Sequence, residues 1–482
     1  MIRPVRGATI WALACGLMAV SAHPGLSQAP PLTVSPALLT AGQTLTFTVT
    51  GRSGQNPVIA FSRFGAGGGR FRGQTLLLGG DLRGLAGGLI GPGGTYTFSV
   101  PIPAGLSGLF FFQAAVADDA ALTTNVVLTN GAEISLGGAH PVNNQVMGRP
   151  IPVGLRPLFA VAIPSQFPNL IHVINGGSNS LSVIDNTTDQ VVTTIPLPGA
   201  VGNTATVTQK IFVAIAGTSL APDNRVVVVD PATNTIIATL TVGSRPVGMD
   251  NSGDITQVFT ANSGDGTLSI IDIAGLTAST IPIGGTPIGV NGFDVSNRAY
   301  VLSSDRNVFV LDTTTNQVIT RIPVGNNPSG PPGIAAINRI YVSNFNDGTV
   351  SVIDTTTNSV TATIPVGGNP RFPGVSTVLK KIYVPDGAAN STKLFVVDAT
   401  TNTLVKTITI GKGTHNTRLS PDGFRLYVTN GTDNTVSVID TTTDTVVATI
   451  PVGAVPNSIR FTRDGLKAYI INQSDGTVTV IN

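Results

Sequence analysis

The acidic side chains of this chain are almost all aspartates, in positions typical of turns rather than of acid–base catalysis. Glu133 is the only glutamate among the 25 acidic residues of the 482-residue chain. Aspartate precedes glycine in Asp265-Gly266 and Asp475-Gly476, and elsewhere it closes a Val-Ile-Asp run that threonines follow. Aspartate accepts hydrogen bonds from the backbone N–H groups of such turns. We expect these carboxylates to shape turns, with calcium at the Asn-Phe-Asn-Asp-Gly type of turn as the alternative.

Histidine and cysteine give little support for a metal or cofactor site. His140, His172 and His415 are far apart in the chain, and we interpret His172 as a packed, hydrogen-bonded strand residue. The only cysteine, Cys15, and the only tryptophan, Trp11, lie in the N-terminal segment. The rest of the chain therefore has no thiolate ligand, no disulfide and no tryptophan-derived quinone. We expect no cofactor, with calcium as the alternative.

Basic and aromatic side chains recur in the Gly- and Pro-containing segments that separate β-branched runs. Such side chains bind acidic groups and stack on planar ones. No phosphate-binding glycine loop and no Gly-x-Ser-x-Gly motif accompanies them. Loop residues also vary when nothing constrains them, which is the competing interpretation. The candidate binding residues are Arg156, Arg245, Phe345, Arg371, Lys412 and His415.

A repeat of about 42 residues runs from residue 149 to the C-terminus. Its most regular position closes a Val-Ile-Asp type of run, and successive copies lie 40 to 45 residues apart. Such self-similarity predicts stacked supersecondary units. The position is occupied by Asp185, Asp230, Asp272, Asp312, Asp354, Asp398, Asp440 and finally Asn482.

Each unit predicts four short antiparallel strands. Its β-branched runs are separated by Gly, Asn, Asp and Pro, and polar and apolar residues alternate within them, as in residues 435–439. A small sheet with two apolar faces must stack against its neighbours, and a closed ring leaves no exposed end. The sequence therefore predicts an all-β fold, a β-propeller.

The ends of the repeat region predict how the ring closes. Eight Tyr-Val type strands recur, but the chain stops at residues 477–482, one strand short of a full unit. Residues 150–154 match the fourth strand of other units, yet no repeat precedes them. We predict eight blades, the last completed by residues 150–154, so that removing the final six residues destabilises the whole ring. Seven blades is the alternative if one divergent unit forms none.

The strand motif resembles the YVTN β-propeller repeat family. Residues 341–344 (Tyr-Val-Ser-Asn) and 427–430 (Tyr-Val-Thr-Asn) are each followed, after a short turn, by Thr-Val-Ser-Val-Ile-Asp-Thr-Thr-Thr. The family includes archaeal surface-layer proteins and exported bacterial proteins, and the resemblance covers about 330 of the 482 residues. It implies a propeller and an exported protein. The units containing Phe212, Phe259 and Tyr300 depart from the motif, so no family ligand site is transferred.

The N-terminus predicts a signal peptide. Arg3 and Arg6 precede an apolar stretch at residues 8–20, and small residues then allow cleavage after residue 22, with cleavage after residue 29 as the alternative. The protein is then secreted, periplasmic or attached to the cell surface. No stretch is long enough to predict a transmembrane helix.

One further domain is predicted between this segment and the propeller. Residues 30–133 contain alternating runs without a repeat, such as residues 44–50, and predict a small antiparallel β-sandwich. Residues 134–148 are expected to form the linker to the propeller at residues 149–482.

These elements predict a binding or scaffold protein rather than an enzyme. Propeller loops that enter the innermost strands gather on one face, so the candidate residues would meet around the tunnel. We expect a monomer that engages a protein or polysaccharide partner there. The alternative is a calcium-dependent lactone hydrolase or quinoprotein, whose inner-strand candidates are Asp250, Asn251, Asn291 and Asp294.

Nucleic acid is a third possible partner, because at least one exported YVTN protein binds DNA. Loss of the signal peptide would leave 25 basic and 25 acidic residues. A balanced chain has no long-range field that attracts nucleic acid, so the sequence argues against DNA binding.

Overall fold

The structure is a computed structural model of the chain, which clusters into two compact units, Met1–His140 and Pro141–Asn482. The expected signal peptide at residues 1–22 and the alternative cleavage after residue 29 lie outside the described residues. Of residues 1–143, 203–207 and 293, only the backbone of strands is described. Residues 144–482 are otherwise described apart from 163–168, 208–209, 294–296, 331, 335–336 and 463–464.

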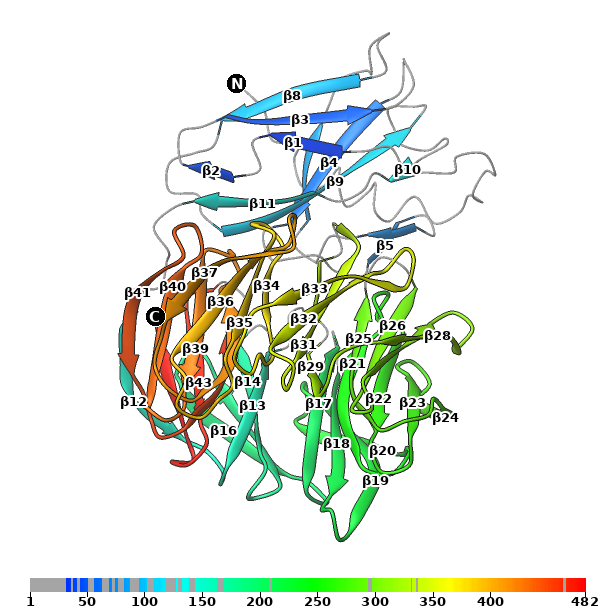
Figure 1. Ribbon diagram of the computed structural model, residues 1–482, viewed down its shortest axis with the longest axis vertical. Helices are drawn as coiled ribbons and strands as arrows, with labels where there is room; N and C mark the ends of the chain where they lie inside the picture. Colours follow the sequence, from blue (N-terminus) through cyan, green and yellow to red (C-terminus); the bar gives the residue numbers. More distant parts are fainter. Residues whose placement is uncertain are drawn as a thin grey trace. The chain divides into compact units, whose positions relative to one another are not determined.

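The first unit is built from β-strands (Figure 1). Its two larger sheets have the strand orders β1-β3-β8 and β2-β11-β9-β4-β7, and β10 pairs with β9. Their pairs are antiparallel, as predicted, except β2 with β11, which is parallel. The strands are β1 (Leu32–Ser35), β2 (Leu38–Thr40), β3 (Thr44–Thr50), β4 (Asn56–Ser62), β5 (Gly69–Phe71), β6 (Gln74–Leu76), β7 (Leu82–Ala86), β8 (Thr95–Pro101), β9 (Gly108–Ala117), β10 (Val127–Leu128) and β11 (Ala132–Gly137).

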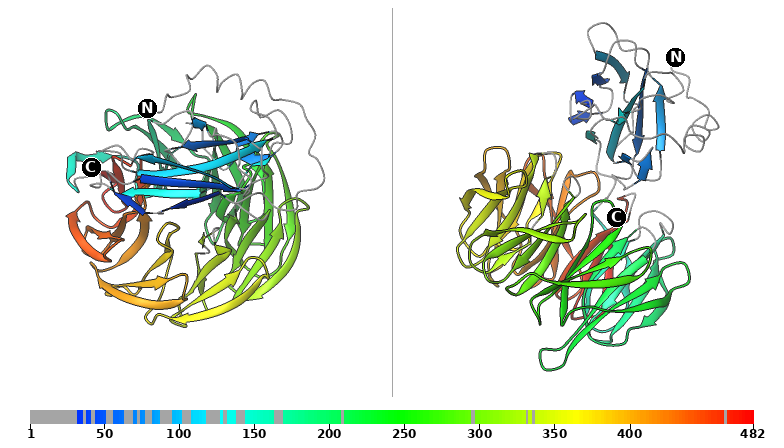
Figure 2. Two further views of the ribbon diagram at one scale, coloured as in Figure 1. Left: turned by 90° about the horizontal axis from the view of Figure 1, so that it is seen from above. Right: turned by 90° about the vertical axis from the view of Figure 1, so that its right-hand side faces the viewer.

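The second unit is an eight-bladed β-propeller, as the repeat predicts. Its blades follow one another around a ring (Figure 2), and each is an antiparallel sheet of four or five strands. Blades 1 to 4 contain β13 (Pro157–Ala162), β14 (Leu170–Asn175), β15 (Ser180–Asp185), β16 (Gln190–Pro196), β17 (Val201–Val207), β18 (Lys210–Gly217), β19 (Pro222–Asp230), β20 (Thr235–Thr241), β21 (Pro246–Asn251), β22 (Gln257–Asn262), β23 (Thr267–Asp272), β24 (Thr277–Pro282), β25 (Pro287–Phe293), β26 (Arg298–Ser303), β27 (Asn307–Asp312) and β28 (Gln317–Pro323). Blades 5 to 8 contain β29 (Pro328–Ser329), β30 (Gly333–Ile334), β31 (Arg339–Asn344), β32 (Thr349–Asp354), β33 (Ser359–Pro365), β34 (Gly374–Ser376), β35 (Lys381–Pro385), β36 (Lys393–Asp398), β37 (Thr403–Thr409), β38 (Thr414–Leu419), β39 (Arg425–Asn430), β40 (Thr435–Asp440), β41 (Thr445–Pro451), β42 (Pro456–Phe461), β43 (Ala468–Asn472), β44 (Thr477–Ile481) and β12 (Val146–Pro152).

The ring closes through β12, which is the fourth strand of blade 8. It pairs antiparallel with β44, with Val146 opposite Ile481 and Pro152 opposite Thr477. The strand begins at residue 146 rather than 150, and its register shifts between Met147 and Ile151. The predicted closure is therefore confirmed, with a longer strand than the repeat alone indicated.

Apolar side chains fill the spaces between neighbouring blades. One cluster joins Tyr383 and Val396 of blade 6 to Leu426 and Val428 of blade 7, and all four are fully buried. Each sheet thus buries apolar area that it could not bury alone, which is the main stabilising contribution in such a ring. The fully buried tyrosines are Tyr300, Tyr341, Tyr383, Tyr427 and Tyr469.

Several tyrosine hydroxyls also bond to the following blade. Tyr383 donates to Asp444 Oδ1 at 2.8 Å, and Tyr469 donates to Asp189 Oδ1 at 2.5 Å. Lys467 Nζ lies 2.7 Å from the other oxygen of Asp189. Asp189 and Asp444 have positive φ angles of 53° and 54°, a conformation that aspartate adopts more readily than most residues. These contacts link blade 6 to blade 7 and blade 8 to blade 1.

The aspartates of the repeat shape turns, as predicted. Asp440 Oδ1 accepts the backbone N–H groups of Thr442 and Thr443 at 2.9 and 3.2 Å. Asp265 Oδ2 accepts the N–H of Ser244 at 2.5 Å and so holds the loop that enters the same blade. Their oxygens satisfy backbone donors that the turns leave without strand partners.

The asparagine of the Tyr-Val-Thr-Asn motif is also structural. Asn430 Nδ2 donates to Thr435 Oγ1 at 3.0 Å and to Ser437 Oγ at 2.9 Å, both on the next strand. The same pair of bonds recurs in other blades, so the asparagine of the motif stabilises the blade rather than forming a ligand site. The equivalent donors are Asn175, Asn262, Asn344 and Asn472.

His172 is a packed strand residue, as predicted, but it lacks the predicted hydrogen bond to any described residue. It is fully buried in β14, and neither ring nitrogen has a hydrogen-bond partner among the described residues, so the expected hydrogen bond was wrong. Burial lowers the pKa of His172 to about 4, because the low-dielectric interior disfavours the charged ring. The nearby Asn234 side chain opposes that shift in part without reaching hydrogen-bond geometry.

Within the part of the chain that is described, no helix is long and apolar enough to cross a membrane.

Candidate functional site

The loops that enter the innermost strands lie against the turns between second and third strands. Arg156 O accepts the N–H of Gly176 at 2.9 Å, and Arg245 O accepts the N–H of Ser263 at 3.0 Å. Because this pairing recurs, these loops and turns belong to one face of the propeller, as the sequence predicted. This face is called the loop face below.

Arg156 and Arg245 are exposed residues of this face with a backbone role. Their φ angles of 48° and 55° place both in the left-handed region, which closes the loop before the first strand. Both side chains are exposed. Neither residue lines the cavity described below.

Phe345, Arg371 and Phe372 come together on the loop face between blades 5 and 6. The guanidinium carbon of Arg371 lies 5.8 Å from the ring centroid of Phe345 and 5.2 Å from that of Phe372. Both distances are those of cation–π contacts. Asn369 Nδ2 donates to Phe345 O at 3.1 Å and so ties the loop to the turn. A Cβ at Gly387 would lie 2.0 Å from Arg371 Cδ, so only glycine leaves room for this arginine.

Prolines interrupt the innermost strands of these two blades. In blade 5, β29 and β30 are two-residue pieces separated by the Gly-Pro-Pro segment at residues 330–332. In blade 6, Pro370 forms only an isolated bridge, and β34 begins after Pro373. Proline has no N–H to donate to the ladder, so the inner strand breaks where it occurs. Phe372, between these prolines, has a φ of 29°, which is a strained value for a bulky residue.

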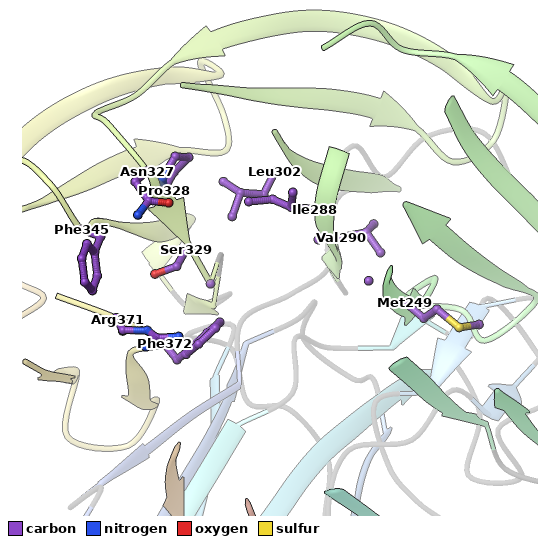
Figure 3. A pocket seen from close by; sticks show the side chains of 13 residues that line it. Met249, Ile288, Val290, Leu302, Asn327, Pro328, Ser329, Phe345, Arg371 and Phe372 are labelled. Atoms are coloured by element: carbon purple, nitrogen blue, oxygen red, sulfur yellow. The ribbon is translucent and has the colours of Figure 1, made fainter. Parts of the chain in front are cut away.

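A cavity of about 560 Å³ opens beside these interrupted strands (Figure 3). Its apolar side comes from β21, β25 and β26, through Met249, Ile288, Val290 and Leu302. Blades 3 and 4 approach closely here, since a Cβ at Gly248 would lie 2.6 Å from the Cα of Gly289. Its volume lies within the range of pockets that hold small ligands.

Polar groups stand at the opposite side of the cavity. Figure 3 shows Arg371 and Phe372 together there, near Ser329. Ser329 Oγ is buried and has no hydrogen-bond partner among the described residues. Arg371 forms no ion pair with any described residue, and Phe372 is 44% exposed. A buried hydroxyl without a partner costs free energy that a bound polar group would recover.

Lys412 and His415 lie where the chain enters blade 7, just before and within β38. Lys412 donates its backbone N–H to Asp433 Oδ2 at 2.8 Å and accepts the N–H of Thr432 through its carbonyl, while its side chain is exposed. His415 retains exposed area, yet surrounding protein atoms and the positive charge of Arg371 lower its pKa. A lowered pKa favours the neutral form of the His415 ring. Of the six predicted residues, Phe345 and Arg371 line the cavity, and the other four do not.

Two of the inner-strand candidates for catalysis, Asp250 and Asn251, are engaged in the scaffold. Asp250 accepts the N–H groups of Asn251 and Gly292, both at 3.0 Å, and so joins blades 3 and 4. Asp294 lies outside the described residues. Among the residues that are described, no three His, Cys, Asp or Glu side chains come together to hold a metal ion.

The apolar side of the cavity was missed by sequence reasoning. Met249, Ile288 and Leu302 resemble ordinary core residues of their repeats, and only the fold shows that they face a space. One signal was available, because the prolines at residues 331, 332 and 373 depart from the repeat in two consecutive blades.

Comparisons with known proteins support the fold. No protein-family model matches this sequence, and no curated protein matches it. Solved structures do match. The dihydro-heme d1 dehydrogenase NirN in complex with DHE has a TM-score of 0.56 at 17% identity, over 64% of this chain and 69% of that one. The computationally designed Ika8 protein has a TM-score of 0.57 at 14% identity, over 69% of this chain and 99% of that one. Kuenenia stuttgartiensis hydrazine synthase has a TM-score of 0.48 at 17% identity, over 70% and 99%. At identities this low, the two structures with TM-scores above 0.5 support the propeller fold alone.

Proposed function

We propose that this chain is an exported, non-catalytic binding protein that receives an apolar segment of a protein partner in the loop-face cavity. The observation that supports this best is the combination in one cavity of an apolar side, a buried Ser329 hydroxyl and an Arg371 guanidinium, neither of which has a hydrogen-bonded or ionic partner, respectively, among the described residues.

The chemistry of the cavity favours a peptide over a polysaccharide. Met249, Ile288 and Leu302 offer apolar area and no hydrogen bonds, whereas a sugar ring presents hydroxyls on most of its edges. An apolar side chain would occupy that region. A carboxylate of the same segment would reach Arg371, whose planar donors suit it.

The proposal of export rests on the N-terminal sequence. The order of basic, apolar and small residues in residues 1–22 is that of a signal peptide. The repeat supports membership in the YVTN family, which contains exported propellers. N-terminal sequencing of the mature protein would test export: a start at residue 23 or 30 supports it, and an intact Met1 contradicts it.

The cavity is tested with 8-anilinonaphthalene-1-sulfonate, a dye with an apolar body and one anionic group. Saturable fluorescence enhancement is expected with the wild-type protein. Arg371→Met keeps the stem that packs on Gly387 but removes the charge, and should weaken dye binding at least fivefold. Short apolar peptides with a free carboxylate should displace the dye.

The matched control is Arg245→Met, which removes a charge from the same face outside the cavity. Its dye affinity should equal that of the wild type. Equal affinity in Arg371→Met, or displacement of the dye by oligosaccharides and not by peptides, would contradict the proposal.

A further inference from the structure

Two arginines occupy equivalent positions on the innermost strands of adjacent blades. Arg418 of β38 lies opposite Tyr427 of β39, and Arg460 of β42 lies opposite Tyr469 of β43. The strands β38 and β42 contact each other, and β42 also contacts β13 of blade 1. The two side chains therefore belong to the wall of the central tunnel, at one level of the ring.

Neither arginine is neutralised by a described carboxylate. Arg460 Nη2 donates to the carbonyl oxygen of Ala162 in blade 1 at 3.0 Å, which positions its guanidinium across the junction of blades 8 and 1. The guanidinium of Arg418 has no hydrogen bond or ion pair with any described residue. Solvent reaches it in the tunnel. Asp250 holds the equivalent position of blade 3, but both its oxygens accept backbone N–H groups there.

The surroundings of the pair penalise its positive charge. Burial among the tunnel strands lowers the pKa of Arg460 to about 9, and the nearby charge of Arg418 lowers it further in the same direction. Surrounding protein atoms also lower the pKa of Arg418, although its side chain is exposed to solvent. Two neighbouring cations in a confined wall cost free energy that a bound anion would offset.

We propose that Arg418 and Arg460 bind an oxyanion, a carboxylate or phosphate group, in the tunnel where blades 7, 8 and 1 meet. Guanidinium groups present paired N–H donors that match two oxygens of either group. Arg460 is already oriented by Ala162, so one side of the site is formed before the ligand arrives. This site is separate from the loop-face cavity, whose lining includes neither arginine.

The test compares inorganic phosphate with succinate at constant ionic strength, using calorimetric titration and thermal unfolding. Wild-type protein should bind at least one of the two anions saturably, with a rise in unfolding temperature that sodium chloride does not reproduce. Binding of phosphate alone, or of succinate alone, identifies which group the site takes. Arg418→Met/Arg460→Met should weaken that binding at least tenfold.

The charge-matched control is Arg156→Met/Arg245→Met, which should bind like the wild type. Without anion, the unfolding temperature of Arg418→Met/Arg460→Met serves as the folding control, because the change removes both two like charges and the bond from Arg460 to Ala162. If it fails to fold, the single variant Arg418→Gln serves for titration. Undiminished binding in these tunnel variants, or no response of the wild type beyond that to sodium chloride, overturns the proposal. Dye binding to the loop-face cavity should be unchanged, so the two proposals fail independently.

Discussion

Tyr469 joins the last blade to the first through a single hydroxyl. Its bond of 2.5 Å to Asp189 ends on a carboxylate that Lys467 also contacts. Tyr341, at the same position of blade 5, reaches only the carbonyl of Ala399 at 3.5 Å, near the limit of a hydrogen bond. The same residue type therefore contributes differently at different junctions.

Replacing Tyr469 with Phe should lower the free energy of unfolding by about 1–2 kcal/mol, since a hydrogen bond to a charged acceptor is lost. Tyr341→Phe, the matched control, should cost well under ~1 kcal/mol. Urea unfolding of both variants measures the difference. Equal costs would show that the hydroxyl bond to Asp189 does not stabilise the junction.

His172 predicts a pH dependence with a defined sign. Its pKa is about 4 in the folded chain and about 6.5 when unfolded, so the unfolded chain binds more protons between these values. Stability is therefore fully present above pH 6.5 and falls as the pH approaches 4. The slope is about 1.4 kcal/mol per pH unit, which amounts to roughly 2–3 kcal/mol between pH 6.5 and 4.5.

His172→Phe should remove that loss, because blades 2 and 3 carry Phe212 and Phe259 at the same position. Urea unfolding at pH 7 and pH 4.5 provides the comparison. If wild type and variant lose the same stability on acidification, His172 is not the cause.

The role of a single residue was predictable from the sequence where its side chain bonds to neighbours in the chain. The turn role of Asp440 follows from its neighbours two and three residues away. The missing hydrogen bond of His172 was not predictable, because the groups around its ring come from a different blade. The missing partner of the Ser329 hydroxyl was not predictable either, because it depends on the path of the interrupted inner strand. The repeat pattern alone does not predict which side chains of different blades contact each other.

Among the strands, β44 takes part in several structural contacts at once. It pairs with both β43 and β12, and its residues Val478, Val480 and Ile481 are 0–1% exposed. They pack with Ile171 of blade 1 or with blade 7. The strand thus completes one sheet and two interfaces between blades.

Deleting residues 477–482 should unfold the ring cooperatively rather than trim a tail. Each of the three buried side chains contributes about 1.5–3 kcal/mol, and a typical domain has only 5–15 kcal/mol in total. Deleting Asn482 alone removes two backbone bonds with Gln145, of 3.2 and 3.1 Å, and should cost about 1–2 kcal/mol. Circular dichroism during heating distinguishes the two; a native-like transition in the longer deletion contradicts this prediction.

Strand identity and closure were predictable because the period of the repeat and the missing fourth strand are both visible in the chain. The cavity was not. It depends on interrupted inner strands of blades 5 and 6 facing intact strands of blades 3 and 4, which is a relation between elements. The prolines showed where the repeat breaks but not what the break would face.

At the scale of the molecule, the eight blades share one construction and differ in what lines the tunnel and the loop face. The tyrosines, asparagines and aspartates of the repeat are used by the scaffold itself. Residues that depart from the repeat, such as Phe372, Arg418 and Arg460, occupy the surfaces that remain accessible. The side chains that distinguish one blade from another therefore lie on the innermost strands and their loops. The outer strands serve the same structural role in each blade.

The pairing of β12 with β44 also sets how the ring responds to tension. The pair is antiparallel, and Gln145 and Asn482 exchange backbone bonds at its open end. A force applied between these two residues would load the bonds one after another, as in opening a zipper, and never share the load among them. Single-molecule stretching from these points should open blade 8 first and at low force. Thermal unfolding involves the interfaces between all blades, whereas mechanical unfolding would begin at the β12–β44 pair alone.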